Sequence, residues 1–308
     1  MDRFENMTHF VRVVENGSIS AAAERLGVAK SAVSRRLKEL EEHLGVELFH
    51  RTTRSMNLTD TGQAFYQQAS RILDDLHEAE LATSQAHSTV SGCLKVALPS
   101  SFGLMHMSPA IDDFLQQNPG IEFDLDFNDR QVDLIEEGFD LAIRIAKLPD
   151  SSLIARRIAT IRSVVCASPA YLEQHGVPKH PAELAEHDCL TYSLIPDPYQ
   201  WRFTDPDGKA VKVKVRSKMM ASTGEFLRFA AVQGYGIINS PSFIAYEELA
   251  AGTLVPILED HSQTDINAYA VYPPTRHLSQ RVRSFVDHLV ERFDGTPYWD
   301  QWRRTDRG

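Results

Sequence analysis

Short polar and cationic side chains gather in one stretch of the sequence that has helical spacing. They are Lys30, Ser31, Ser34, Arg35 and Lys38. Apolar residues recur every three or four positions from Val33 to Leu44, and at about 100° per residue they occupy the opposite face of a helix. Exposed hydroxyl and guanidinium groups on a helix can hydrogen-bond to base edges and phosphates in the major groove of DNA. The pattern therefore predicts a DNA-recognition helix.

A second interpretation of this face is a solvated helix surface stabilised by ion pairs. Arg35 and Lys38 each stand four residues before a glutamate, at Glu39 and Glu42, and i,i+4 pairs of this kind stabilise isolated helices. For an isolated helix this would be the simpler explanation, so the neighbouring elements decide between the two.

Two short helices are predicted before this one. Apolar spacing indicates a helix over Phe4–Glu15, which Gly17 would end, and the Ala-rich stretch "SAAAERL" indicates a second helix that ends at Gly27. Two short helices joined by a Gly-containing turn are typical of a helix-turn-helix. This context favours DNA reading by the third helix over the solvated alternative.

A basic turn follows the third predicted helix. The runs "ELFHR" and "SMNLT" have strand character, so we predict a hairpin, or wing, whose Arg51, Thr52 and Arg54 contact phosphates or the minor groove. The alternative is an ordinary hairpin with its cations in solvent. From Arg25 to Arg54 the chain has seven Lys or Arg and four Glu, whereas its overall net charge is −10. This distribution indicates a locally basic head on an acidic body, not a protein that coats nucleic acid.

A long helix is predicted after Thr59, and its small and apolar positions alternate in steps of four and three. The seam consists of Phe65, Ala69, Ile72, Leu76 and Ala79, and it continues to Thr83 and Ala86. This heptad spacing is typical of a helix that pairs with its own copy, so it predicts a homodimer. The alternative is a helix packed on its own domain.

Residues 1–90 resemble the N-terminal region of the LysR-type transcriptional regulators. The resemblance rests on Ala21-Ala22, Leu26-Gly27, "SAVS" at 31–34, Leu40-Glu41, Leu44-Gly45, "LFHR" at 48–51 and "LTDTG" at 58–62. It implies a winged helix-turn-helix domain over 1–60 and a linker and dimerisation helix over 61–90. It also implies double-stranded operator DNA, RNA polymerase and further copies of the chain, in a homodimer or homotetramer, as partners. Where the family often has Ser-Gln before the recognition helix this chain has Ala29-Lys30, so Lys30 is expected to contact phosphate.

The rest of the chain alternates strand-like and helical segments. "CLKVAL", "IEFDLDF" and "DLAIRI" have strand character, and "RQVDLIEEGF" is predicted to form a short helix. Such alternation indicates an α/β fold with a parallel sheet and helical crossovers. Ser100 and Ser101 follow the first strand, where the free amides and hydroxyls at a helix start would suit a carboxylate. Simple capping of the helix by serine is the alternative.

This body resembles, more loosely, the two-lobed effector domain of the same family, which is similar to type 2 periplasmic binding proteins. The resemblance rests on "GFDLAIRI", "SVVCASPAYL" and "EFLRFAAVQGYGIINSP". It implies an effector domain over 91–297, with lobe I at about 91–162 and 268–297 and lobe II at about 163–267. A small effector, with an organic or aromatic acid as the first guess, would bind between the lobes.

The residues that this resemblance places in the cleft come from both lobes. They are Ser100, Ser101, Phe102, Asn128 and Arg144 from lobe I, and Ser222 and Thr223 from lobe II. Arg144 would either bind an anion or close a structural ion pair, and both readings stay open.

Several classes of function find no support in the sequence. It has no nucleophile elbow, P-loop or zinc motif, and Cys93, Cys166 and Cys189 are too few and too far apart for a disulfide framework or a thiolate zinc site. We therefore expect no cofactor, no metal and no catalytic residues. No apolar run approaches the roughly 20 residues that span a bilayer, and no signal-peptide pattern is present, so we expect a cytoplasmic protein without a membrane partner.

The leading hypothesis is a transcriptional regulator controlled by a small effector. The alternative is a small-molecule binding protein, or an enzyme built on the α/β body, with an accessory DNA-binding head. That alternative would leave the helix-turn-helix pattern and the heptad seam without a role.

Overall fold

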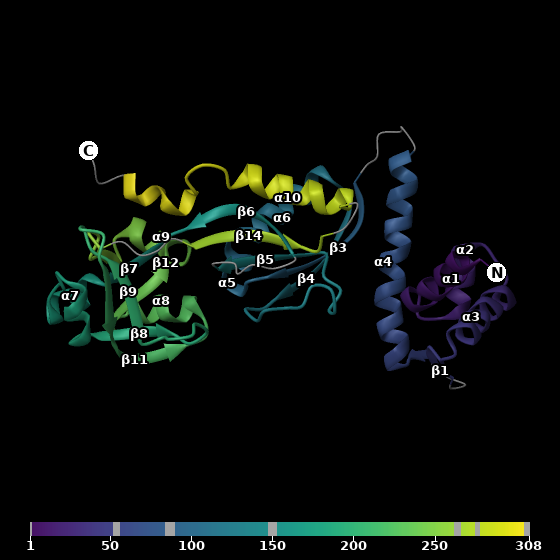
Figure 1. Ribbon diagram of the computed structural model, residues 1–308, viewed down its shortest axis with the longest axis horizontal. Coiled ribbons are helices and arrows are strands. Elements are labelled where there is room, and N and C mark those ends of the chain that lie inside the picture. Colours follow the sequence, from purple (N-terminus) through teal and green to yellow (C-terminus); the bar gives the residue numbers. More distant parts are fainter. Residues whose placement is uncertain are drawn as a thin grey trace. The chain divides into compact units, whose positions relative to one another are not determined.

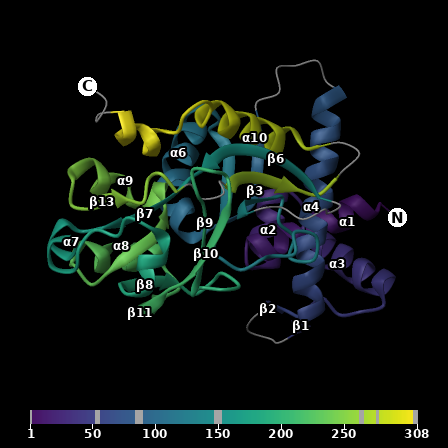
Figure 2. The same cartoon turned by 60° about the vertical axis from the view of Figure 1, so that its left-hand side comes forward.

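The structure, a computed structural model, describes residues 2–51, 56–83, 90–146, 153–261, 266–274 and 278–304 (Figures 1 and 2). It divides into two compact units, Met1–Gly92 and Cys93–Gly308. Each unit has its own hydrophobic core. Within the described residues, no helix is long and apolar enough to cross a membrane.

The first unit combines three packed helices with a wing and a long helix. Its helices are α1 (Arg3–Glu15), α2 (Ile19–Leu26), α3 (Lys30–Leu44) and α4 (Asp60–Thr83), and its antiparallel wing strands are β1 (Phe49–Arg51) and β2 (Met56–Leu58). The Ser18 hydroxyl caps α2 by accepting from the Ala21 amide (3.1 Å), and Gly27 ends α2 with a left-handed backbone (φ 67°). The predicted helix-turn-helix and wing strands are confirmed.

Helix α4 packs along its first half against the core of its own unit. Phe10 is fully buried there, and its ring lies 5.4 Å from the ring of Phe65. Ala69 is fully buried in the same core. Ala69 therefore serves this unit, which corrects the prediction that it belongs to a dimer seam, whereas Phe65 packs on the same core but is only half-buried. The heptad spacing could not distinguish packing on a helix of the same unit from packing on a second copy of the chain. Here a helix of the same unit, α1, covers this stretch of α4.

The later positions of the predicted seam are less covered. Ile72 is 45% exposed and Leu76 is half-buried. The side chain of Ala79 lies outside what the structure describes. Among the described side chains of the predicted seam, Ile72 keeps the most apolar surface for another copy of the chain.

Glu41 fixes the point where the chain leaves α3 and enters the wing. Its carboxylate is buried, and Oε1 accepts hydrogen bonds from the backbone amides of Leu48 (2.9 Å) and Phe49 (3.3 Å). Hydrogen bonds to an ionised acceptor are stronger than those between neutral groups. Strand β1 thus begins at a fixed place relative to the recognition helix.

Thr59 and Gly62 join the wing to α4. The Thr59 hydroxyl donates to the Glu47 carbonyl (2.8 Å) and accepts from the Gly62 amide (2.9 Å), so it caps α4 and also holds the chain before β1. A Cβ atom on Gly62 would lie 2.0 Å from the Leu48 carbonyl oxygen. The backbones approach so closely at this point that a glycine is required.

Lobe I of the second unit is built on a five-stranded sheet in the order β4-β3-β5-β14-β6. Its strands are β3 (Ser91–Leu98), β4 (Gly120–Phe127), β5 (Leu141–Ala146), β6 (Ile154–Ile161) and β14 (Ile266–Tyr272). Its helices are α5 (Ser100–Phe102), the π-helix η1 (Gly103–Met107), α6 (Ser108–Gln117) and α10 (Gln280–Arg292). Helices α6 and α10 pack against each other and against the sheet (Figure 1).

Lobe II is built on a second five-stranded sheet in the order β11-β8-β12-β7-β13. Its strands are β7 (Ser163–Ala167), β8 (Asp188–Tyr192), β11 (Arg216–Ala221), β12 (Ile237–Pro241) and β13 (Val255–Ile257), with a separate hairpin of β9 (Gln200–Thr204) and β10 (Ala210–Lys214). Its helices are α7 (Pro169–His175), the 3-10 helix η2 (Pro181–Ala185), α8 (Gly224–Val232) and α9 (Ser242–Ala251). A C-terminal 3-10 helix, η3 (Tyr298–Arg304), packs against α9.

Both main sheets are mixed, whereas the sequence predicted a parallel sheet. Strands β3 and β5 are parallel, but β14 pairs antiparallel with both β5 and β6. In lobe II, β12 is parallel to β8 and antiparallel to β7. The path of the chain is the cause, because it leaves lobe I after β6, builds lobe II and returns with β14 between two strands that are already in place.

The short helix predicted in "RQVDLIEEGF" is a single turn. The Asp133 carboxylate accepts from the amides of Ile135 (2.9 Å) and Glu136 (3.0 Å), which starts a helical turn. Gly138 then adopts a left-handed backbone (φ 73°) and ends it. The apolar spacing is helical in this stretch, but the glycine comes too soon for a helix to extend.

Replacing Glu41 should loosen the wing while leaving the helices in place. In Glu41→Ala the amides of Leu48 and Phe49 lose a buried charged acceptor, so their hydrogen exchange should quicken by about tenfold or more, equivalent to roughly 1–3 kcal/mol. The matched control is Glu42→Ala, which removes a side chain that is 64% exposed. Unchanged protection of both amides in Glu41→Ala, measured by residue-resolved hydrogen exchange, would contradict the anchoring role.

Candidate nucleic-acid interface and effector cleft

The solvent face of α3 carries all five residues predicted to read DNA. Lys30, Ser31, Ser34, Arg35 and Lys38 are exposed. Val33, Leu37 and Leu40 are buried on the opposite side of the helix, against the core of the unit. The structure thus brings the predicted residues together on one face, and their contact with DNA stays a prediction.

The two ion pairs of the alternative interpretation are also present on this face. Arg35 Nε lies 3.8 Å from Glu39 Oε1, and Lys38 Nζ lies 3.5 Å from Glu42 Oε1, with both cationic side chains 67% exposed. Exposed pairs of this kind contribute roughly 0–1 kcal/mol and are screened by salt. The pairs therefore do not prevent these cations from turning to a phosphate.

Arg36, by contrast, holds the helix in place. Its guanidinium pairs with Glu5 of α1 (2.5 Å) and with Glu39 (3.2 Å), and its side chain is only 22% exposed. The recognition helix is therefore fastened to α1 by the one arginine of this stretch that the prediction left out of the interface.

The wing is described in part. Strands β1 and β2 pair antiparallel from Phe49 opposite Leu58 to Arg51 opposite Met56. The predicted contacts Thr52 and Arg54, and the side chain of Arg51, lie outside the described residues. The base of the wing is thus described, and the role of its tip stays a prediction.

Ser101 of lobe I and Glu225 of lobe II meet across the two lobes. Ser101 Oγ donates to Glu225 Oε2 (2.8 Å). Ser101 lies in α5, just after β3, and Glu225 lies in the first turn of α8. The amide of Ser100 stays within lobe I and donates to Asp129 Oδ1 (3.0 Å), just beyond the end of β4. Polar groups from two strand ends and a helix start therefore gather where the lobes touch.

Tyr192, the last residue of β8, lies near both carboxylates of this region. Burial and then the negative charges of Asp129 and Glu225 raise the pKa of Tyr192 to about 12. Its phenol therefore remains protonated and can donate a hydrogen bond. The place where the lobes meet is consequently acidic and rich in hydrogen-bond acceptors.

Three further predicted residues border this region. Ser222 and Thr223 are exposed in the loop that leads into α8. The backbone amide of Asn128 donates to the Leu98 carbonyl (3.0 Å). The side-chain nitrogen, Nδ2, is buried and has no hydrogen-bond partner among the described residues. Such a donor is available to a ligand or an ordered water. These positions are compatible with the predicted cleft, and ligand contact by them stays a prediction.

Phe102 does not line the cleft as predicted. It is fully buried, and its ring lies 5.2 Å from the ring of Phe243 and 5.7 Å from that of Trp299. The turn from α5 into η1 directs this side chain into an aromatic core, away from solvent. Phe102 directly follows Ser100 and Ser101 in the sequence, so its position alone gave no reason to expect that its side chain points elsewhere.

Arg144 is held by the backbone of its own lobe. Its Nη2 donates to the Val132 carbonyl (2.7 Å). Burial lowers the pKa of the Arg144 guanidinium, while the nearby Asp133 opposes this shift. The described bond of Arg144 is to a backbone carbonyl and is neither of the two predicted contacts, so anion binding and a structural ion pair both stay predictions.

Asp129, Tyr192 and Glu225 are absent from the residues predicted for the cleft. Asp129 follows Asn128 and Glu225 comes two residues after Thr223, so both stand beside predicted positions. A search for carboxylates just after strand ends and in first helical turns would have found them. Tyr192 carries no such local signal, because it comes near the two acids only through the packing of lobe II and the contact of the two lobes.

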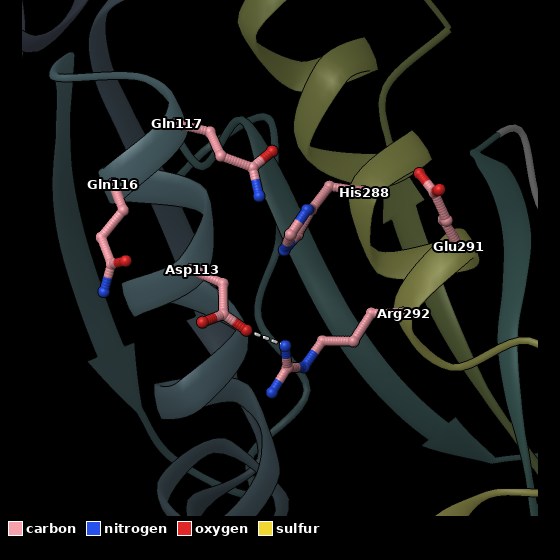
Figure 3. A pocket seen from close by; sticks show the side chains of 6 residues that line it. All are labelled: Asp113, Gln116, Gln117, His288, Glu291 and Arg292. Atoms are coloured by element: carbon pink, nitrogen blue, oxygen red, sulfur yellow. Dashed lines mark hydrogen bonds and ion pairs between the residues drawn. The ribbon is translucent and has the colours of Figure 1, made fainter.

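A separate hollow of about 570 Å³ lies on lobe I between α6 and α10 (Figure 3). Its lining residues are Asp113, Gln116, Gln117, His288, Glu291 and Arg292. Beside this hollow, Arg292 pairs with Asp113, and His288 Nε2 donates to the Ala110 carbonyl (3.0 Å). These polar contacts hold α10 against α6. Across the described ranges of the chain, no group of three or more His, Cys, Asp or Glu side chains is placed to hold a metal ion.

Two family models match the chain over most of its length. The bacterial regulatory helix-turn-helix model of the lysR family matches residues 4–63, and the LysR substrate binding domain matches residues 87–294. The chain is 38% identical to the regulator CrgA of Neisseria meningitidis serogroup B, over 93% of this chain and 96% of that protein. It is 35% identical to a helix-turn-helix-type transcriptional regulator of Haemophilus influenzae, over 92% of this chain and 98% of that protein.

Solved structures of full-length regulators agree with these matches. The structure of CrgA from Neisseria meningitidis covers 94% of this chain and 99% of its own, at 37% identity and a TM-score of 0.62. The structure of the virulence activator AphB from Vibrio cholerae covers 95% of this chain and 100% of its own, at 30% identity and a TM-score of 0.61. The helix-turn-helix head, the two-lobed body and these likenesses lead to one conclusion: the chain belongs to the LysR family of DNA-binding transcriptional regulators, which carry an effector-binding domain and are not enzymes.

Proposed function

We propose that α3 reads an operator through its first two turns. Ser31, Ser34 and Arg35 contact base edges, while Lys30 and Lys38 contact phosphates. The observation that carries this assignment is the exposed face of α3, on which the cations are paired only at long distance. Arg51, Thr52 and Arg54 of the wing add phosphate or minor-groove contacts. The regulator acts in the cytoplasm, where its operator is accessible.

Removing Arg35 should weaken specific binding to the operator. If Arg35 reads a base, Arg35→Ala lowers the binding free energy by about 1–3 kcal/mol and relaxes preference at one base position. The operator is first located by footprinting the DNA next to the gene, and affinity is then measured by gel shift. Arg12→Ala is the matched control, since Arg12 is also exposed and paired with a glutamate, in α1 of the same unit. An Arg35→Ala variant with unchanged affinity and intact fold would remove Arg35 from the interface.

The later part of α4 pairs with the same helix of a second copy. Ile72 and Leu76 keep apolar surface there, and Ala79 continues the heptad register. The seam is thus narrower than the one predicted from spacing, because its first two positions are used by the core of the head. A dimer, or a tetramer of two dimers, then acts on transcription by RNA polymerase at the adjacent promoter.

A charge in this narrower seam should break the dimer. Ile72→Asp places a carboxylate in the apolar contact between two helices, so sedimentation velocity should show a shift to lower mass at micromolar concentration. Val177→Asp is the control, because Val177 is an exposed apolar residue (56%) of lobe II. An Ile72→Asp protein that sediments like the parent would show that α4 does not carry the dimer.

The effector binds between the lobes beside Ser101 and Glu225, and it presents hydrogen-bond donors or a positive charge. Two observations support this: the contact of the two residues across the lobes, and the second carboxylate at Asp129. An organic or aromatic acid, the first guess from the sequence, would meet two like charges here. An amine or another cationic small molecule fits the site better.

A thermal-shift screen of matched amines and carboxylic acids tests this assignment. Ligands that raise the melting temperature should come from the amines, and Glu225→Gln should abolish their effect by removing the charge that they bind. Glu173→Gln makes the same change on an exposed position of lobe II and should leave the effect intact. Ligands that stabilise the Glu225→Gln protein as strongly as the parent, or that come from the acids, would place the effector elsewhere.

A further inference from the structure

The segment after α10 returns from lobe I to lobe II. Helix α10 ends at Arg292, and the chain continues through Phe293 to η3, which packs against α9 (Figure 1). The matched model of the LysR substrate binding domain ends at residue 294. Helix η3 therefore lies outside the part of the chain that this family model describes.

Trp299 of this segment is inserted between the lobes. It is fully buried, and its ring lies 5.7 Å from Phe102 and 4.6 Å from His106, both of lobe I. It also lies 6.4 Å from Phe243, at the start of α9 in lobe II. Aromatic contacts at these distances stabilise beyond the area that they bury. One side chain from the C-terminus thus belongs to the cores of both lobes.

His106 adds a directional contact between the same parts. Its Nε2 must donate to the Phe243 carbonyl (3.1 Å), because a carbonyl only accepts. Nδ1 of the neutral ring then accepts from the Tyr298 hydroxyl (2.5 Å). Burial lowers the pKa of His106 to about 4, which keeps the ring neutral and this arrangement intact near neutral pH. A residue of lobe I is thereby bonded to both α9 and η3.

Asp300, which follows Trp299 in η3, holds the point where the chain passes from lobe I to lobe II. Arg162 is the single residue between β6 of lobe I and β7 of lobe II. Its guanidinium pairs with Asp300 Oδ2 (2.6 Å), and the Asp300 side chain is only 1% exposed. The Arg162 carbonyl also accepts from the Ser242 amide of α9 (2.8 Å). Backbone and side chain of the crossing are therefore both fixed.

We propose that the segment from Phe293 to Trp302 is a lock that sets how far the two lobes open. For the lobes to move apart, Trp299 has to leave the core of one of the two lobes. The backbone at Arg162, which connects the lobes, also has to rotate relative to Asp300. Trp299, Asp300 and His106 are then positioning residues for the effector cleft, which they do not touch. This inference rests on the proposed function only in taking the space between the lobes as the effector site.

The lock is tested by measuring distances between lobes in the full-length protein without any effector. Spin labels are attached to Gln116→Cys in lobe I and Glu173→Cys in lobe II, both exposed, in a Cys93→Ser background. The remaining cysteines, Cys166 and Cys189, are buried and do not take the label. In Trp299→Leu and in Asp300→Asn the pulsed-dipolar distance distribution should broaden and shift relative to the parent.

Two controls separate a lock from a general loss of stability. Phe203→Leu removes a buried ring from the core of lobe II formed with the β9–β10 hairpin, and should leave the distribution unchanged. Trp299→Phe keeps an aromatic ring between the lobes and should restore most of the parent distribution. Parent-like distributions in both Trp299→Leu and Asp300→Asn, or equal broadening in Phe203→Leu, would overturn the proposal.

The outcome does not depend on the effector assignment. No effector is present in these samples, so a Glu225→Gln protein with normal ligand binding would overturn the cleft assignment and leave the distance result as it stands. Conversely, unchanged distances between the lobes would contradict the lock proposal and would not affect the thermal-shift result.

Discussion

The effector domain depends on how two lobes are held together by a chain that passes from β6 to β7, returns from β13 to β14 and passes to lobe II again after α10. At the first passage Arg162 alone separates β6 from β7, and its carbonyl and guanidinium are both engaged. So short a connection allows the lobes to rotate about a few backbone dihedrals but not to slide apart. Because Ser101 and Glu225 belong to different lobes, such a rotation makes or breaks their hydrogen bond. The geometry of the crossing and the contents of the cleft are therefore linked.

The DNA-binding head separates the charges that stabilise it from the charges that it exposes. Glu41 binds two backbone amides inside the unit, and Arg36 ties α3 to α1. Hydrogen bonds to charged groups contribute roughly 1.5–3 kcal/mol each, whereas the exposed pairs of Arg35 and Lys38 contribute roughly 0–1 kcal/mol. The exposed cations can thus exchange a carboxylate for a phosphate without loosening the fold. Because the overall charge is −10, the rest of the chain would repel DNA, which agrees with the proposal that binding is limited to this face.

Structural features that depend on neighbouring residues along the chain could be predicted from the sequence. Features that depend on contacts between distant segments could not. The helices of the head and the wing strands follow from apolar spacing, from the Ser18 cap and from Gly27. The direction of β14 in its sheet could not be read in this way, since it depends on where the chain returns after building lobe II. In the candidate site, Ser101 was identified from its place after a strand, but its partner Glu225 is 124 residues away. The burial of Phe102 likewise depends on Phe243 and Trp299, which no local pattern connects to it.

If the effector binds where we propose, the carboxylates beside it link its charge to the arrangement of the two lobes. Asp129 of lobe I and Glu225 of lobe II both lie near the phenol of Tyr192, whose pKa is raised first by burial and then by these two carboxylates. Asp129 is exposed and Glu225 is half-buried, so solvent weakens their mutual repulsion, and the Ser101–Glu225 hydrogen bond across the lobes forms beside them. A ligand shifts the balance between open and closed lobes only by binding one of them better. If the effector is the cation that we propose, it would be attracted by carboxylates from both lobes and would favour the arrangement that holds them close, whereas an anion would not. Under the proposed function, the same two acids would then act both on the choice of ligand and on the arrangement of the lobes that it stabilises.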